Sequence, residues 1–266
     1  MLRINDFQTM KKEGKPIAMV TAYDYPSAKM AEAADVDMIL VGDSLGMVVL
    51  GYESTVQVTL DDMLHHAKAV KRGAKDTYIV VDMPFMSCHA SLESAVNNAA
   101  RLFRESGANA LKIEGGTENI LELTERLTNG GIPVIIHLGL MPQSVNVYGG
   151  YKVQGRSEEA AARILREALE AEKSGAVGLL LECIPEPLAN EITGKVSIPT
   201  IGIGSGRGCD GQVLVYHDLL KYGVDRLAKF AKGYADLNNI ASEAIGTYVE
   251  QVKSGMFPDD EHVFLK

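Results

Sequence analysis

The sequence lacks several features that would each define a class of protein. No uninterrupted apolar run approaches the roughly 18 residues that a membrane-spanning helix needs, so no membrane partner is expected. Basic residues are in the minority, with 26 Lys and Arg against 35 Asp and Glu and a formal net charge of −9. Because nucleic-acid surfaces need clustered Lys and Arg to contact phosphates, a nucleic-acid partner is not expected either.

Cysteine is also scarce. Cys88, Cys183 and Cys209 are odd in number and far apart in the chain. This usage excludes a disulfide framework and a paired-cysteine zinc motif, and it is typical of a reducing cytoplasm. Residues 1–13 are polar and lack the apolar core of a secretory signal, which gives the same expectation of a cytoplasmic protein.

What the sequence does contain is a repeated alternation of short apolar runs with helical segments. Of the 266 residues, 46% are hydrophobic and 23% are charged, which is enough for a sizeable core. Strands are predicted at 16–21, 37–41, 78–82, 110–114, 133–137, 178–181 and 199–203, with an eighth somewhere in 226–230. Helices are predicted at 4–14, 27–34, 59–73, 91–106, 118–128, 157–173 and 236–254.

This order favours parallel strands, which need a crossover connection between one strand and the next. No dinucleotide-binding fingerprint follows the first strand, so an eight-stranded (β/α) barrel fits better than a doubly wound sheet. No break in composition marks a linker. We therefore expect a single α/β domain over residues 1–266, preceded by a short N-terminal helix that acts as a plug or lid.

Three acidic residues, Asp43, Asp82 and Glu114, stand at the ends of separate apolar runs. In a parallel barrel the carboxyl ends of all strands open on one face, so these side chains should converge. Burying three carboxylates together is costly unless a cation compensates them. Oxygen ligands without a Cys or His pair favour Mg²⁺, with Mn²⁺ or Co²⁺ as substitutes. The alternative for each acid taken singly is a helix cap or an ion pair with Lys or Arg.

Four further residues are candidates for the same site: Ser44, Lys112, His137 and Glu182. Lys112 shares a strand face with Glu114, so it could hold a substrate carboxylate or an enolate oxygen, or form a structural ion pair. The leucines before Glu182 could bury it and make it a better base toward a carbon acid, although it could also be a fourth ligand. His137 could be catalytic or a buried structural histidine, and Ser44 offers a hydroxyl group to a bound anion.

Together these residues predict a Mg²⁺-dependent barrel enzyme that enolises a small oxo-acid. A metal chelated by an α-oxo carboxylate acts as a Lewis acid, so a glutamate can remove the adjacent proton. A non-catalytic barrel that binds metabolites is the alternative from another class. Such a protein has no physical need to keep several desolvated carboxylates together.

Six short strings, in chain order, carry a resemblance to a known family. They are VGDSLGMV at 41–48, VDMPF at 81–85, LKIEGG at 111–116, HLGLMPQSVN at 137–146, KVQGR at 152–156 and GCDGQVLV at 208–215. Together they closely resemble ketopantoate hydroxymethyltransferases, and the likeness covers nearly the whole chain. The resemblance implies a (β/α)₈ barrel of the phosphoenolpyruvate/pyruvate type, usually assembled as a homodecamer.

The resemblance also implies a reaction, the first committed step of pantothenate biosynthesis. In it, 3-methyl-2-oxobutanoate, 5,10-methylenetetrahydrofolate and water give 2-dehydropantoate and tetrahydrofolate. A lyase or mutase of the same superfamily is the alternative among enzymes, and dependence on folate separates the two.

By motif match, the resemblance further implies roles for single residues. Mg²⁺, one per subunit, is expected on Asp43, Asp82 and Glu114. The oxo-acid is expected on Asp43, Ser44, Asp82 and Lys112, with Glu182 as the proton acceptor and His137 as a possible supporting residue. Met141 stands where threonine is expected, which could alter loop packing near the folate. Residues 205–207 and 227–230 also depart from the family pattern, but no departure falls on the implied metal or base positions.

Overall fold

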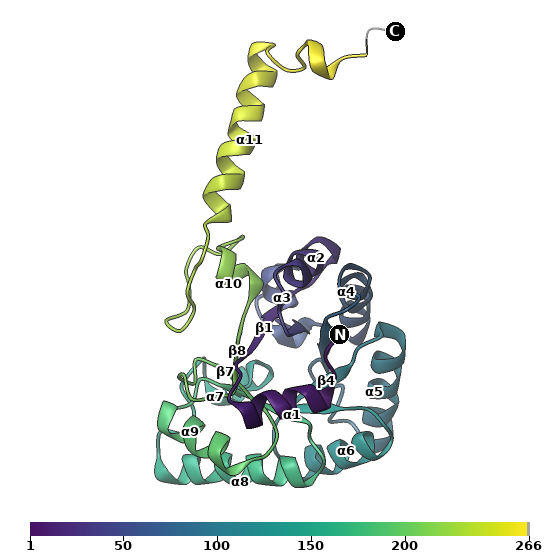
Figure 1. The fold of residues 1–266 in the computed structure, drawn as a ribbon, viewed down its shortest axis with the longest axis vertical. Coiled ribbons are helices and arrows are strands. Elements are labelled where there is room, and N and C mark those ends of the chain that lie inside the picture. The colour runs from purple at the N-terminus through teal and green to yellow at the C-terminus, as the bar shows by residue number, and fades with distance from the viewer. Residues whose placement is uncertain (265–266) are drawn as a thin grey trace. The chain divides into compact units, whose positions relative to one another are not determined.

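Eight parallel strands of the computed structural model close into a barrel in sequence order (Figure 1). The structure describes residues 1–264. The strands are β1 Ile17–Thr21, β2 Met38–Val41, β3 Tyr78–Asp82, β4 Ala110–Glu114, β5 Val134–Gly139, β6 Gly178–Glu182, β7 Thr200–Ile203 and β8 Gly211–Leu214. The predicted (β/α) barrel is thus confirmed.

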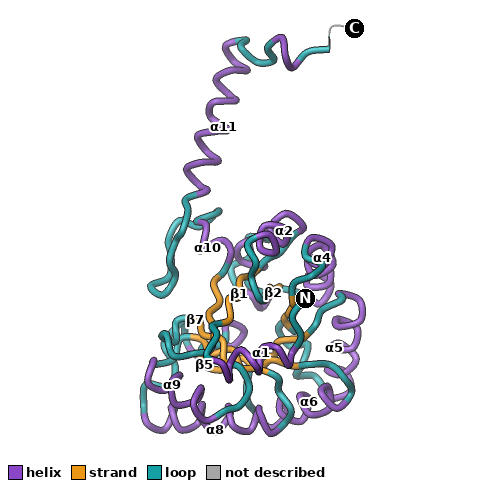
Figure 2. The backbone as a smooth tube through the Cα atoms, viewed as in Figure 1, coloured by secondary structure: helices purple, strands orange, loops and turns teal. Residues whose placement is uncertain are grey.

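Helices surround the strands, as Figure 2 shows for residues 1–215. They are α1 Ile4–Glu13, α2 Tyr25–Ala33, α3 Leu45–Val48, α4 Leu60–Gly73, α5 Leu92–Ser106, α6 Glu118–Asn129, α7 Val145–Tyr148, α8 Glu158–Lys173 and α9 Glu186–Lys195, with 3₁₀ turns η1 Thr55–Gln57 and η2 Pro142–Ser144. Each long outer helix packs on the next, in the order α2, α4, α5, α6, α8 and α9. A capping box at Thr59 and Asp62 starts α4, with each side chain accepting a backbone N–H of the other residue.

Alternate side chains along the strands fill the barrel with apolar groups, because successive residues of a strand point to opposite faces. The inward-facing residues of this core are Ile17, Met19, Met38, Leu40, Tyr78, Val80, Ala110, Ile135, Leu180, Ile201, Ile203 and Val213. The residues between them, such as Ile39 and Ile79, are also buried. The strands are therefore apolar on both faces, which is why they form continuous apolar runs in the sequence.

Helix α1 packs on the inner core through Phe7, which is fully buried. The Phe7 ring meets Tyr78, the first residue of β3, edge to face at 5.1 Å between centroids. Contact with the first residue of a strand places Phe7 at the amino-terminal end of the barrel. Helix α1 is therefore a plug and not a lid, since active sites of such barrels form at the opposite end.

The eighth strand is β8, Gly211–Leu214, so its prediction in residues 226–230 was wrong. β8 pairs with β1 on one side and β7 on the other, which closes the barrel. Asp210 fixes its start, because its carboxylate accepts hydrogen bonds from the Thr200 backbone N–H at 2.8 Å and from Lys11 at 2.7 Å. With only four residues, one of them the exposed Gln212, β8 carries too weak an apolar pattern to stand out in the sequence.

The chain divides into two compact units, Met1–Val215 and Tyr216–Lys266. The second unit contains α10 Tyr216–Leu220, α11 Leu237–Ser254 and the 3₁₀ turn η3 Asp260–His262. No residue of α11 is buried. The single domain over 1–266 stays a prediction. Within residues 1–264, no helix has both the length and the apolar character needed to cross a membrane.

Replacing Phe7 with alanine should lower the free energy of unfolding by about 3–5 kcal/mol, because it empties a fully buried aromatic site. Phe85→Ala is the matched control, since Phe85 is 41% exposed. The control should cost less than about 1 kcal/mol. Urea unfolding followed by circular dichroism measures both, and equal losses would contradict the role of Phe7 as a plug.

Candidate active site

The inward-facing rows of the barrel change from apolar to charged at the carboxyl ends of four neighbouring strands. Val80 is followed by Asp82 on β3, and Ala110 by Lys112 and Glu114 on β4. On β5 and β6 the rows end in His137 and Glu182 in the same way. Strand register sets Asp82 beside Lys112, and Glu114 beside His137. The structure thus brings together the side chains that the sequence predicted to converge.

Asp43 lies two residues beyond β2 and is buried against Asp82. The Asp43 backbone N–H donates to Oδ2 of Asp82 at 3.0 Å. Gly42 permits this approach, because a Cβ at residue 42 would lie 2.9 Å from Oγ of Ser44 and 3.5 Å from Oδ2 of Asp82. A side chain at residue 42 would therefore displace the Ser44 hydroxyl group next to the Asp43–Asp82 contact.

Lys112 is the buried cation among these acids. Its Nζ lies 3.2 Å from Oδ1 of Asp82 and 3.1 Å from Nδ1 of His137. Burial alone would lower the pKa of Lys112, but the charges of Asp82, Glu114 and Asp43 outweigh it and raise the pKa above its usual value. The ammonium group stays charged, and it pairs with Asp82 as well as facing Glu114.

His137 lies between Lys112 and Glu182. Burial, with the charge of Lys112 added to it, lowers the pKa of His137 well below its usual value, so the ring is neutral. Because Lys112 donates to Nδ1, the proton of the neutral ring belongs on Nε2. Nε2 lies 3.3 Å from Oε2 of Glu182. Nε2 is buried and has no hydrogen-bond partner among the described residues, so His137 lies next to Glu182 without a hydrogen bond to it.

The acids at this end of the barrel carry more charge than the protein compensates. Burial and the neighbouring charge of Asp82 raise the pKa of Asp43 to about 7. Burial raises the pKa of Glu182 to about 7, and burial with the charge of Asp43 raises that of Glu114 well above its usual value. Four carboxyl groups share one ammonium group, so an added cation would relieve their repulsion.

The donor atoms suit a hard divalent cation such as Mg²⁺, which prefers carboxylate oxygens. Oδ1 of Asp82 and Oε1 of Glu114 are buried, yet neither accepts a hydrogen bond from the described residues. Within residues 1–264, however, no three Asp, Glu, His or Cys side chains already form a metal-binding group. The chemistry of the residues fits a cation, but the arrangement seen here is not a finished coordination shell.

Gln143 and Tyr23 take part in this region although no sequence pattern singled them out. The Gln143 side-chain amide donates to Oδ2 of Asp43 at 2.7 Å, and its backbone N–H donates to Oε2 of Glu114 at 3.1 Å. The Tyr23 hydroxyl lies 2.8 Å from Oγ of Ser44, which is half-buried beside Asp43. Both residues are in connecting segments, where no periodicity reports which side chains turn toward the site.

Gly139 brings the segment after β5 against the end of β6. Its φ of +99° lies in the region that favours glycine. A Cβ at residue 139 would collide with the carbonyl oxygen of Glu182. That oxygen accepts the Leu140 N–H at 2.8 Å, so this approach fixes the backbone that carries Glu182.

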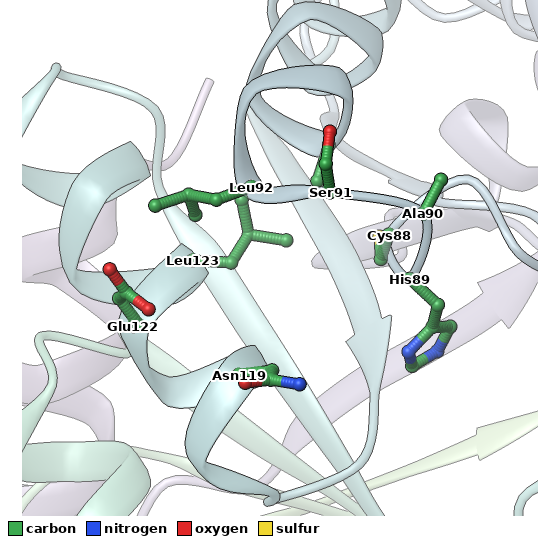
Figure 3. Close-up of a pocket in the computed structure, with 9 residues that line it drawn as sticks. Cys88, His89, Ala90, Ser91, Leu92, Asn119, Glu122 and Leu123 are labelled. Carbon is green, nitrogen blue, oxygen red and sulfur yellow. The ribbon is translucent and has the colours of Figure 1, made fainter.

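Among the described residues, hollows lie between the segments that follow β3, β4 and β5. The larger, about 170 Å³, is lined by residues 88–92 together with α6 residues such as Asn119 and Glu122 (Figure 3). None of its lining residues belongs to the predicted site. The smaller, about 110 Å³, includes Glu114, Met141 and Gln143 in its lining.

Comparison with known proteins identifies the family that the sequence resembles. A sequence profile described as ketopantoate hydroxymethyltransferase matches residues 1–260. The 3-methyl-2-oxobutanoate hydroxymethyltransferase of Bacillus pumilus (strain SAFR-032) is 59% identical over 259 residues, covering 97% of this chain and 92% of its own. That of Bacillus licheniformis is 60% identical over 259 residues, covering 97% and 93%.

Solved structures with a similar barrel are much more distant in sequence. A 2,3-dimethylmalate lyase, a member of the PEP mutase/isocitrate lyase superfamily, has a TM-score of 0.61 at 15% identity, covering 100% of this chain and 93% of its own. A phosphonopyruvate hydrolase complex with oxalate and Mg²⁺ has a TM-score of 0.63 at 11% identity, covering 99% and 92%. At these identities the likeness concerns the fold alone, and it confirms the predicted barrel type.

Gly139→Ala should destabilise the chain by about 2–4 kcal/mol, since it combines positive-φ strain with a backbone collision. Gly131→Ala is the matched control: Gly131 has a φ of +90°, but a Cβ there meets nothing within 4 Å. The control should cost only the strain, about 1 kcal/mol. Thermal unfolding of both variants measures the difference, and equal costs would argue against the close approach to β6.

Proposed function

Because the chain belongs to the ketopantoate hydroxymethyltransferase family, it catalyses the hydroxymethyl transfer of pantothenate biosynthesis, and we propose that the charged end of the barrel is its active site. Family membership implies methylenetetrahydrofolate as the co-substrate. One observation carries the proposal: three buried carboxyl groups and the half-buried Glu182 converge around one buried lysine at the carboxyl ends of adjacent strands. Such a cluster is costly to a fold that does not use it.

In this proposal Asp43, Asp82 and Glu114 hold one Mg²⁺ per subunit. Buried oxygens of Asp82 and Glu114 that accept no hydrogen bond, and the raised pKa of Asp43 and Glu114, support these three as the ligands. The similar barrel of phosphonopyruvate hydrolase was solved with Mg²⁺ and oxalate, a small dicarboxylate. When bound, Mg²⁺ supplies Lewis acidity that makes the C–H group beside an oxo group easier to deprotonate.

The residues around this site would position 3-methyl-2-oxobutanoate. The Lys112 ammonium group provides the positive charge that an oxo-acid carboxylate requires. Ser44 adds a hydroxyl group that Tyr23 holds in place. Asp43 and Asp82 lie beside these two groups and border the same space.

Glu182 would take the proton from C3 of the oxo-acid. Its raised pKa of about 7 suits a general base near neutral pH. The C3–H electron pair then forms the bond to the methylene carbon, and one of the two bonds from that carbon to folate nitrogens breaks. Water replaces the other nitrogen and supplies the hydroxyl group of the product. The proton from C3 and one proton of the water go to the two nitrogens, so tetrahydrofolate leaves with both protonated.

The chain would act as a homo-oligomer in the cytoplasm. Helix α11 carries exposed apolar residues that a second copy could cover, among them Ile240, Ile245 and Tyr248. This supports self-association, and the resemblance suggests a decamer. Cys88, Cys183 and Cys209 are all free, in keeping with a reducing compartment.

Mg²⁺ should raise the melting temperature of the EDTA-treated chain by about 5–10 °C at a hundred times its Kd. Asp82→Asn should abolish most of that rise, because it removes one ligand charge. Asp61→Asn is the control, since Asp61 is an exposed acid paired with Arg101 on the protein surface. Differential scanning fluorimetry measures all three proteins. A full Mg²⁺ response in Asp82→Asn would remove Asp82 from the metal site.

Glu182→Gln should slow exchange of the C3 proton in D₂O by about 10²- to 10⁴-fold, because the amide cannot accept the proton. Binding of Mg²⁺ and 3-methyl-2-oxobutanoate should change little, as measured by calorimetry. NMR follows the exchange in the presence of Mg²⁺. Glu191→Gln, at an exposed acid of α9, is the control. Exchange at the wild-type rate in Glu182→Gln would show that another group is the base.

A further inference from the structure

The smaller hollow beside the candidate active site has a composition unlike that of the oxo-acid site. The loop after β3 contributes Phe85 and His89, and the segment after β5 contributes Met141. Glu114, one of the proposed metal ligands, forms part of the same wall. A molecule seated in this hollow would therefore contact Glu114, at the edge of the candidate active site.

The lining of this hollow suits a flat, uncharged ring. Phe85 is 41% exposed, so its ring face is available to a ligand, and aromatic faces stack on heterocycles. Met141 adds a polarizable thioether that adapts to a ring edge. Gly115 keeps the floor open, because a Cβ there would lie 3.8 Å from Ile120 and 3.9 Å from Met141 and would occupy that space.

The charged groups that line this hollow do not suit the binding of the oxo-acid. Its lining contains no Lys or Arg, so it offers no ammonium or guanidinium group to a substrate carboxylate. Hydroxyl groups of Thr117 and Ser144, together with the His89 ring, provide hydrogen-bonding groups instead. A neutral heterocycle with polar edges meets these conditions, whereas a small anion does not.

We propose that this hollow receives the pterin end of the reduced folate that donates the one-carbon unit. The assignment depends on the proposed function, since it places the co-substrate of that same reaction. A volume of about 110 Å³ is far below the roughly 300–1,000 Å³ of sites that bury a whole drug-sized ligand, so one end of the folate enters and the rest extends outward. Only the pterin end carries the transferred carbon, and it must approach the oxo-acid.

The larger hollow of Figure 3 is the rival position, and it fits the pterin less well. Its lining includes Asn119 and Glu122 but none of the proposed ligands or substrate contacts. A pterin ring held there would not touch the wall that Glu114 forms. The glutamate tail of a folate would also meet Glu122 without a compensating Lys or Arg in that lining.

The absence of tryptophan from this chain allows a direct test. Phe85→Trp keeps an aromatic ring in the hollow and introduces a single tryptophan, which can be excited apart from the tyrosines. Its emission should be quenched by tetrahydrofolate, added as the probe to the full-length chain with Mg²⁺ and 3-methyl-2-oxobutanoate. Val147→Trp is the matched control on the segment that also carries Met141, because Val147 is 88% exposed and does not line the hollow. The emission of Val147→Trp measures how much signal is lost because tetrahydrofolate absorbs light. It should show no quenching beyond that loss.

Phe85→Ala supplies the energetic test. Loss of stacking should weaken tetrahydrofolate binding and raise the KM for methylenetetrahydrofolate roughly tenfold. The KM for 3-methyl-2-oxobutanoate should change much less, and Val147→Ala should leave both KM values unaltered. This split distinguishes a folate contact from general damage to the fold, which would affect both substrates.

Each outcome decides between the possibilities. Quenching in Phe85→Trp together with the selective KM change in Phe85→Ala supports the pterin seat. Equal quenching of both tryptophan reporters, or an unchanged folate KM in Phe85→Ala, overturns it while leaving the transferase reaction in place. If the wild-type chain forms no product with methylenetetrahydrofolate, the proposed active site itself fails, and the two failures remain distinguishable.

Discussion

The repulsion among four carboxyl groups, three of them buried, is the constraint on which the active end of the barrel depends. Asp43, Asp82, Glu114 and Glu182 surround a single lysine, and burial raises the pKa of three of them. Lys112 and Gln143 each offset part of this repulsion. Lys112 pairs with Asp82, and the side-chain and backbone amides of Gln143 donate hydrogen bonds to Asp43 and Glu114. The remaining excess of negative charge is what gives this end of the barrel its affinity for a cation.

The barrel makes such a cluster possible by placing a rigid apolar core beneath it. The same alternation that points Val80 and Leu180 inward sets Asp82 and Glu182 two residues later on the same face. Phe7 seals the opposite end of that core. Each strand thus contributes apolar side chains to the core along most of its length and reactive side chains at its carboxyl end. The side chains at the carboxyl ends can therefore be charged without disturbing the packing of the core.

The segment after β5 contacts the proposed binding sites of both substrates. Gly139 holds it against Glu182, Gln143 bonds to Asp43 and Glu114, and Met141 lines the adjoining hollow. One short segment therefore contacts the proposed base, the proposed metal ligands and the proposed folate seat. Such an arrangement holds the oxo-acid and the one-carbon donor in a fixed position and orientation relative to each other, which is the main requirement for joining two substrates.

The sequence by itself determined the barrel, seven of its strands and the residues at the strand ends, because strand burial and strand exit leave local patterns of apolar and charged residues. It also determined the family, through strings that span nearly the whole chain. Only the tertiary structure decided where β8 lies, since Gly211–Leu214 is defined by pairing with β1 and β7 rather than by its own composition. The roles of Tyr23, Gln143 and Gly139 likewise arise from contacts between segments distant in the chain, and such contacts leave no periodic signal in the sequence.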